Sequence, residues 1–233
     1  AADMVAKSPP DGHTVLLATM ALYTVMPQMP GMNLPFDVDR DLTPISNLAN
    51  ITNVLVVSPQ SPIRAVPQLI EMARARPGGL TYASAGNGGS QHLAAEMFKR
   101  MAGIDLLHVP YRGGAPAMQD LLSGQINFMC TASGSFLPLI RNNQIRAYAV
   151  TTKERIVGAP DIPTVDEAGL PGLHVSVWNA FYAPKGTPKE AIDRLNAAAN
   201  AALADPTIKR RVTVDMGLDL PAADMRTPAA LGA

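Results

Sequence analysis

The sequence predicts an α/β protein built as two lobes, and three observations support this. Short aliphatic and β-branched runs of strand length alternate with amphipathic stretches, a pattern typical of α/β folds with largely parallel sheets. The 233 residues are enough for one large core or for two smaller ones. Two long extended runs, residues 44–59 and 175–184, lack a helical period and are predicted to cross between the lobes.

The predicted strands are short runs rich in Val, Ile, Leu and Thr. They cover residues 13–19, 53–58, 80–84, 105–111, 126–131, 146–151 and 175–183. A chain that leaves the first lobe near Asn53 and re-enters it near Val175 forms lobe 1 from residues 1–53 and 174–233, and lobe 2 from residues 54–173. Two adjacent crossing strands are what a hinge between lobes requires.

One predicted helix follows the strand at residues 80–84. Ser90 is expected to cap it, because a hydroxyl accepts hydrogen bonds from the first turn of a helix. Its apolar face is expected to contain Leu93, Met97 and Met101, and Gly103 is expected to lie just past its end.

The last part of the chain contains signals for two further helices. Thr187-Pro188-Lys189-Glu190 fits a capping box with proline at the first helical position, and it is predicted to open a long helix. Asp205 followed by Pro206 is predicted to start another helix.

Composition and charge exclude several classes of protein. Hydrophobic residues make up 47% of the chain and charged residues 16%, the opposite of a disordered protein. Nineteen basic residues balance nineteen acidic ones, so no electrostatic footprint for nucleic acid or an anionic membrane is present. No apolar run is long enough for membrane insertion, and no signal peptide is visible. The first residues are typical of the end of a helix, so we expect that part of the protein precedes them.

The most informative segment combines a strand, a glycine-rich loop and the start of a helix. Unpaired N–H groups and the partial positive charge of a helix N-terminus bind anions, and glycines let the anion approach the backbone. The alternative is a tight turn without a ligand. The loop lacks the third glycine of GxGxxG, and the chain has no GxxxxGK[ST] motif. The candidate binding residues here are Ser84, Ala85, Gly86, Asn87, Gly88, Gly89 and Ser90.

Other candidates lie at the ends of further predicted strands, where open α/β sheets bind ligands. Arg112, in a second glycine-containing loop, is either a carboxylate ligand or part of an ion pair between lobes. Trp178 is either a core anchor or a wall of the cleft. The ligand-binding candidates in this group are Thr19, Met20, Ala21, Thr131, Ser133 and Trp178.

The chain lacks a convincing catalytic or metal-binding constellation, so we predict that it is not an enzyme and holds no cofactor or metal. Cys130 lies in an apolar run and is predicted to be a buried hydrophobe. His92 is expected to be exposed on the first helical turn, with a hydrogen bond to ligand or backbone as the alternative. The chain contains neither HExxH nor a GxSxG elbow. A hydrolase that uses the Gly86–Ser90 loop as an anion site remains a rival hypothesis.

Several stretches in one order resemble the Bug/TctC family, the periplasmic substrate-binding proteins of tripartite tricarboxylate transporters. They extend along nearly the whole chain. They are AKSPPDGHTVLLAT, MNLPFDVDRDLTPISNLA, LTYASAGNGGSQHLAAEMFKRMAGIDLLHVPYRGGAPAMQDLLSGQI, IRAYAVTTKER, DIPTVDEAGLPG and WNAFYAPKGTPKEAIDRLNAAANAAL.

The resemblance implies a type II periplasmic-binding-protein fold, with two α/β lobes joined by two crossing strands. It implies a periplasmic monomer that captures a small organic carboxylate with backbone amides and delivers it to the membrane components of the transporter. One binding loop corresponds to Ser84–Ser90, and the segment around Thr19–Ala21 corresponds to another wall of the cleft. The resemblance implies no nucleic-acid partner.

The chain departs from the family pattern at its ends and at one internal position. The family's first strand with its Pro-Gly-Gly loop, and its last helix, have no counterpart here, so the chain resembles a fragment. Asn127 stands where relatives often have aspartate, which is expected to remove a charge near the cleft. A sensory or regulatory ligand-binding domain of the same fold is the alternative function.

Overall fold

The computed structural model describes residues 1–29, 31 and 33–232 and confirms the α/β class. The chain forms two compact units whose main boundaries lie near the predicted ones. The structure differs at Val214–Leu218, which the prediction placed in lobe 1 but which clusters with the central part of the chain. Unit 1 comprises Ala1–Asn50, Val177–Thr213 and Asp219–Ala233, and unit 2 comprises Ile51–Ser176 and Val214–Leu218.

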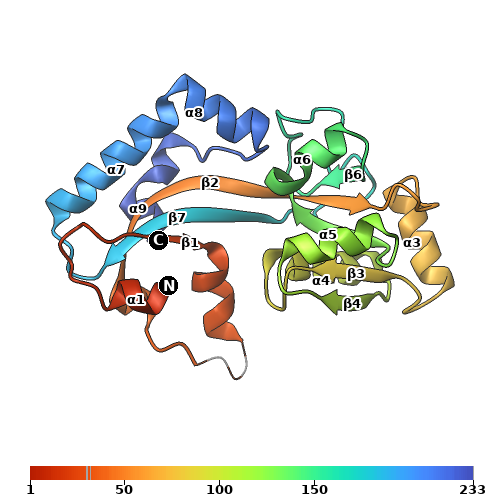
Figure 1. Ribbon diagram of the computed structural model, residues 1–233, viewed down its shortest axis with the longest axis horizontal. Helices are drawn as coiled ribbons and strands as arrows, with labels where there is room; N and C mark the ends of the chain where they lie inside the picture. Colours follow the sequence, from red (N-terminus) through yellow and green to blue (C-terminus); the bar gives the residue numbers. More distant parts are fainter. Residues whose placement is uncertain (30, 32, 233) are drawn as a thin grey trace. The chain divides into compact units, whose positions relative to one another are not determined.

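Unit 1 contains the two ends of the described chain and a small antiparallel sheet (Figure 1). Its strands are β1 (Leu16–Thr19), the first part of β2 (Leu42–Val57) and β7 (Ser176–Pro184). Its helices and turns are α1 (Ala2–Ala6), η1 (Ala21–Val25), η2 (Met26–Gln28), α2 (Val38–Asp41), α7 (Lys189–Ala204), α8 (Pro206–Arg210), η4 (Ala223–Arg226) and α9 (Pro228–Leu231). The turn η3 (Arg211–Asp215) begins in unit 1 and ends in the Val214–Leu218 segment of unit 2.

The sheet of unit 1 has the order β1-β7-β2 and separates two hydrophobic clusters. β1 pairs antiparallel with β7, with Leu16 opposite Tyr182. One cluster brings Val5 of α1 and Leu42 of β2 against these two residues. The other cluster packs Ile192 of α7 against the sheet, which explains why the long helix lies along it.

Unit 2 alternates strands and helices along the chain, as the sequence predicts. Its strands are the second part of β2, β3 (Thr81–Ser84), β4 (Leu107–Pro110), β5 (Phe128–Ala132) and β6 (Arg146–Val150). Its helices are α3 (Val66–Ala75), α4 (Ser90–Ala102), α5 (Gly114–Leu122) and α6 (Ser133–Arg141).

The expectation of a largely parallel sheet is only partly correct. β3 pairs in parallel with β4 and β5, whereas β2 pairs antiparallel with β5 and β6. The reason is that β2 enters unit 2 as one long extended segment that no crossover helix precedes. Because β3, β4 and β5 run in the same direction, their carboxyl ends share one edge of the sheet.

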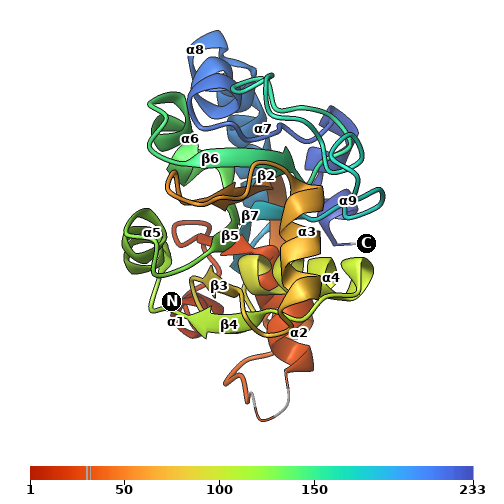
Figure 2. The ribbon, with the colours of Figure 1, turned by 90° about the vertical axis from the view of Figure 1, so that its right-hand side faces the viewer.

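Helices cover both faces of the sheet in unit 2 (Figure 2). Leu55 of β2 belongs to the cluster formed with α3 and α4, and Val56 to the cluster formed with α5 and α6. This burial on both faces explains the continuous apolar run in β2. β3 is therefore held rigidly between two layers of helices, and the loop that follows it has a fixed starting point.

Helix α4 differs from its prediction at its start and on its buried face. It begins at Ser90 with Gly89 as N-cap and ends at Gly103 in the left-handed conformation, as expected for the C-terminal glycine. Met97 and Met101 are exposed, whereas Ala94, Ala95, Phe98 and Ala102 form the buried face. Small residues face the sheet here, which brings the axis of the helix close to β3 and β5.

Candidate functional site

The glycine-rich loop between β3 and α4 encloses a small cavity at the carboxyl edge of the sheet in unit 2. Gly86 has φ 144° and Gly88 has φ 75°, conformations that favour glycine because they crowd a Cβ atom. The cavity has a volume of about 230 Å³. It is lined by Ala85, Gly86, Asn87, Gly89, Ser90 and Gln91.

The N-terminus of α4 leaves main-chain donors free at this cavity. The first intrahelical bond runs from the Leu93 N–H to the Gly89 carbonyl, at 3.0 Å. Gly89 has no side chain, so no side-chain cap forms, and the prediction that Ser90 caps the helix is wrong. Within the described chain, the N–H groups of Ser90, Gln91 and His92 therefore have no acceptor. Together with the partial positive charge of the helix end, they favour an anion.

Two donors of the loop are occupied by side chains from the first turn of α4. The Ala85 N–H donates to Gln91 Oε1 at 2.7 Å, and the Gly88 N–H donates to His92 Nδ1 at 3.1 Å. The sequence interpretation omitted Gln91 from the site and expected His92 to be exposed, whereas both are partly buried. The sequence does contain a signal for these two contacts. A polar side chain at the second or third position of a helix can reach back to the glycine loop that precedes the helix.

The loop after β4 is attached to the glycine loop by main-chain hydrogen bonds. The Tyr111 N–H donates to the Ser84 carbonyl at 2.9 Å, and the Gly113 N–H donates to the Ala85 carbonyl at 3.1 Å. Gly113 is the N-cap of α5 and, like Gly89, provides no side-chain cap. The structure thus brings together the two glycine-containing segments that the sequence singled out.

Beneath the loop, three aromatic rings form a stack. The rings of His92 and His108 are 4.2 Å apart and nearly parallel, and those of His108 and Tyr82 are 4.7 Å apart. Burial lowers the pKa of His108 below its usual range, and His92 adds to this effect. The charge of Glu96 raises the pKa of His108, and the charge of Lys99 lowers it further. The stack therefore supports the loop with packed rings, and the lowered pKa of His108 favours the neutral form of that imidazole.

Ser84 and His108 form a close pair of the kind that the hydrolase hypothesis requires. Ser84 Oγ lies 2.7 Å from His108 Nε2, within the range of a nucleophile and its base. Ser84 is completely buried, however, and its hydroxyl also bonds to the Gly86 backbone. A substrate has no access to this oxygen, so the pair supports the loop rather than performing chemistry.

The predicted residues on β5 and α6 have different positions. Thr131, which is buried, accepts a hydrogen bond from Gln91 Nε2 at 3.0 Å and is thereby connected to the loop. Ser133 is also buried, but its hydroxyl donates to the Gly217 carbonyl at 2.8 Å. It attaches the Val214–Leu218 segment to unit 2 and does not bond to the glycine loop.

The remaining predicted site residues belong to unit 1. Thr19 is exposed at the end of β1, and Met20 and Ala21 are partly buried where η1 begins. Trp178 of β7 packs 6.0 Å from the Tyr23 ring, which stacks on Tyr182 at 4.4 Å. Tyr23, Trp178 and Tyr182 line a cavity of about 720 Å³ within this unit. Trp178 is thus both part of an aromatic cluster and a cavity wall.

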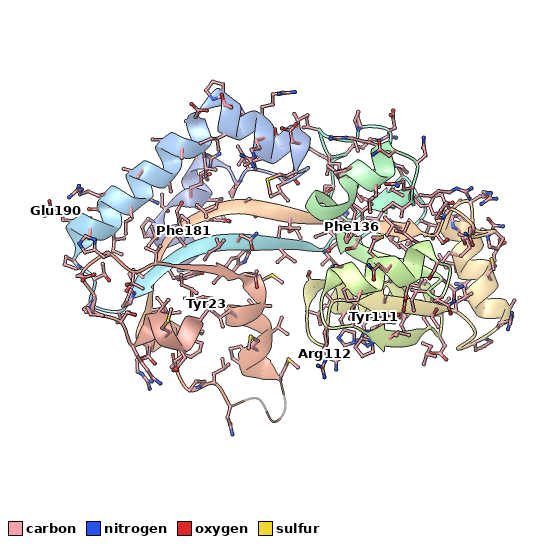
Figure 3. The ribbon with its side chains drawn as sticks, in the orientation of Figure 1. Tyr23, Tyr111, Arg112, Phe136, Phe181 and Glu190 are labelled. Carbon is pink, nitrogen blue, oxygen red and sulfur yellow. The ribbon has the colours of Figure 1, made fainter. Side chains whose placement is uncertain are left out.

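Three other residues from the sequence interpretation lie outside the loop cavity. Arg112 is exposed, and Figure 3 shows its side chain extending outward from the loop after β4. It forms no ion pair with any described residue. Asn127, expected near the cleft, has its Oδ1 accept from the Thr81 N–H at 2.7 Å, at the amino ends of the strands and thus at the opposite edge of the sheet from the loop cavity. Cys130 is buried, which raises its pKa to about 12.

Across residues 1–29, 31 and 33–232, no group of His, Cys, Asp and Glu side chains is arranged to hold a metal ion. None of the helices in this part of the chain is long and apolar enough to cross a membrane.

The comparisons with known proteins agree with the fold and with a binding role. Residues 1–229 match the model of the tripartite tricarboxylate transporter family receptor. A protein of the tcbD–tcbE intergenic region of Pseudomonas sp. strain P51 is 42% identical over 88% of this chain. BugT of Bordetella pertussis is 35% identical over 86% of it. The chain spans 61% and 62% of the lengths of these two relatives.

Solved structures give the same result. A Rhodopseudomonas palustris protein with adipate is 32% identical, with a TM-score of 0.90 over 99% of this chain and 75% of its own. MatC from the same organism, with bound malate, is 31% identical, with a TM-score of 0.84 over 99% of this chain and 78% of its own. The periplasmic binding protein BugD is 32% identical, with a TM-score of 0.85 over 99% of this chain and 76% of its own. BugD is a periplasmic binding protein, and the other two structures contain a small dicarboxylate. The chain belongs to the tripartite tricarboxylate transporter receptor family, also known as the Bug/TctC family.

Proposed function

We propose that the chain is the ligand-binding part of a periplasmic receptor that captures a small organic carboxylate for a tripartite tricarboxylate-type transporter. The observation that carries this proposal is the uncapped N-terminus of α4, where three N–H groups have no acceptor and two of their residues, Ser90 and Gln91, line a cavity. Main-chain donors of this kind bind carboxylates without a cationic side chain. The membrane components of the transporter are the expected partners, and the receptor acts as a monomer.

The chemistry of the cavity supports an acidic ligand over a neutral or basic one. No Asp or Glu lines the cavity, so a bound carboxylate meets no like charge. A sugar or an amine requires acceptors, and the helix end offers only donors. The adipate and malate of the solved relatives are both small dicarboxylates, which agrees with this preference.

Thermal unfolding of the chain with a panel of small acids tests the proposal. A ligand that binds only the native state stabilises it by about 2.7 kcal/mol at 100 times its Kd, which raises the Tm by several degrees. We expect such a rise with adipate, malate or a related acid, and none with the corresponding amides. A rise with sugars or amines, and with no carboxylate, would contradict the proposal.

A further inference from the structure

Gln91 connects the glycine loop to the neighbouring strand through both ends of its carboxamide. Its Oε1 accepts from the Ala85 N–H at 2.7 Å, and its Nε2 donates to Thr131 Oγ1 at 3.0 Å. Ala85 directly follows β3, and Thr131 lies near the end of β5. The side chain also lines the loop cavity, so a ligand in that cavity can reach it.

The partners of Gln91 determine which way its carboxamide is oriented. A main-chain N–H only donates, so the atom that faces Ala85 must be the oxygen. The nitrogen then faces Thr131, and the hydroxyl of Thr131 accepts one of its two N–H groups. The second N–H of Gln91 has no acceptor among the described residues. Gln91 therefore brings one oriented, unused donor to the wall of the cavity.

We infer that Gln91 is a specificity-determining residue whose free carboxamide N–H donates to the ligand carboxylate beside the main-chain donors of α4. The inference rests on the proposed function and adds a side chain to it. One carboxylate oxygen is held by the N–H groups of the first helical turn, and the other accepts from Gln91 Nε2. A primary amide in the same position presents its own N–H₂ to this donor, so the site discriminates against it.

The decisive variant is Gln91→Glu, which preserves the shape of the side chain and the acceptor facing Ala85. It replaces the free N–H with a negatively charged oxygen. We expect adipate and malate to bind about 100-fold more weakly, because the ligand charge meets a like charge where it had a donor. The preference for adipate over its neutral diamide, adipamide, should fall by a similar factor. Isothermal titration calorimetry with these three compounds measures both effects.

Gln91→Met separates a ligand contact from a structural link. Methionine has a similar volume but removes both hydrogen bonds, and we expect about a 10-fold loss of adipate affinity. If Gln91 only links Ala85 to Thr131, the Glu variant retains part of that link and binds better than the Met variant. The inference predicts the opposite order. Repeating the titrations at high salt distinguishes a direct contact from a distant charge effect, because salt screens only the latter.

Gln144→Glu is the matched control, because Gln144 is exposed and precedes β6 at the amino edge of the sheet. It should bind adipate as the unchanged chain does. If the unchanged chain binds adipate or malate and both Gln91 variants bind equally well, the inference is overturned while the proposed function stands. If the unchanged chain binds no carboxylate at all, the proposed function fails, and the inference fails with it.

Discussion

Three short helices of unit 1 have a side-chain cap at the N-terminus, whereas α1 and α7 of that unit and the four described helices of unit 2 have none. In unit 1, Asp37 accepts from the first turn of α2, Asp205 from that of α8 and Thr227 from that of α9. In unit 2, α4 and α5 have Gly89 and Gly113 at the N-cap, and no side chain accepts from either helix. At α2 and α8, a carboxylate of the protein thus occupies the kind of position that we assign to a ligand carboxylate at α4.

The cavities of the two units show that size does not identify the site. Unit 1 contains cavities of about 590 and 720 Å³, both larger than the loop cavity of about 230 Å³. Asp39 lines both of them, and Lys185 lines only the larger one. A carboxylate in either cavity meets a like charge, although Arg40 also lines the smaller one, whereas no charged side chain lines the loop cavity. Donor chemistry, not volume, therefore favours unit 2.

Giving α4 the kind of cap that unit 1 has should produce the largest effect. Gly89 has φ −72° and ψ 165°, which suits an N-cap aspartate, and an added Cβ meets the Gly86 carbonyl only at 3.7 Å. We expect Gly89→Asp to stabilise the fold by a few tenths of a kcal/mol, because glycine is itself a tolerable N-cap. The same variant should weaken adipate binding about 1,000-fold, because its carboxylate takes the place of the ligand.

Gly89→Asn is the control for charge, because asparagine caps a helix equally well without the full negative charge. We expect it to weaken adipate binding by only about 10-fold. Unchanged affinity in the Asp variant, measured by calorimetry together with a raised Tm, would falsify the assignment of the carboxylate to this helix end.

Changing the shape of the loop should have the next largest effect. Gly88→Val forces a β-branched residue into a φ of 75°, so the loop must rearrange, and we expect about a 100-fold loss of adipate affinity. Gly103→Val places the same strain at the other end of α4, where φ is 61° and an added Cβ meets no atom within 4 Å. It should lower the Tm and preserve binding. Equal binding by both variants contradicts a role for the loop.

The histidine stack predicts a pH dependence that belongs to unit 2. Because burial lowers the pKa of His108 in the folded chain, the unfolded chain takes up a proton at higher pH than the native one. This part of the stability is complete above the unfolded pKa of about 6.5 and is lost as the pH falls towards the lower folded pKa. Tm values between pH 7.5 and 5 should fall less steeply in His108→Gln. An identical slope in both proteins contradicts this account.

Removing a cap from unit 1 should have the smallest effect. Asp205 accepts from the Thr207 and Ile208 N–H groups, so Asp205→Ala should cost about 1 kcal/mol and a few degrees of Tm. The affinity for adipate should not change, because this cap serves only its own helix. A large loss of affinity in this variant means that the two kinds of helix end are not functionally distinct.

Sequence periodicity predicted the strands of unit 2 well, because buried β-branched runs between turn signals have few other conformations. It missed the antiparallel entry of β2, since strand direction depends on tertiary connection rather than on local pattern. It also predicted a capping box at Thr187, but the Thr187 hydroxyl bonds to the Pro184 carbonyl instead. A capping box needs this hydroxyl to accept from the Glu190 N–H, whereas here it donates to a carbonyl, and only the folded backbone decides its role.

Within the site, the sequence located the loop but not the side chains that complete it. A run of glycines followed by the start of a helix can be recognised in the sequence. The uncapped N-terminus of α4 follows from Gly89, which has no side chain to cap it. Gln91 and His92 were missed because their roles depend on side chains that turn back from α4 onto the loop. Asn127, which the family resemblance was expected to place near the cleft, lies at the amino edge of the sheet, and the sequence alone does not tell which edge a residue occupies.

Amide NMR during an adipate titration tests the central claim most directly, because it observes the main-chain donors themselves. We predict that the ¹H resonances of the Ser90, Gln91 and His92 amides move downfield together and saturate with one Kd, as hydrogen bonds to a carboxylate form. Saturable binding that leaves these three resonances unmoved, while amides elsewhere in the chain shift, would contradict the account.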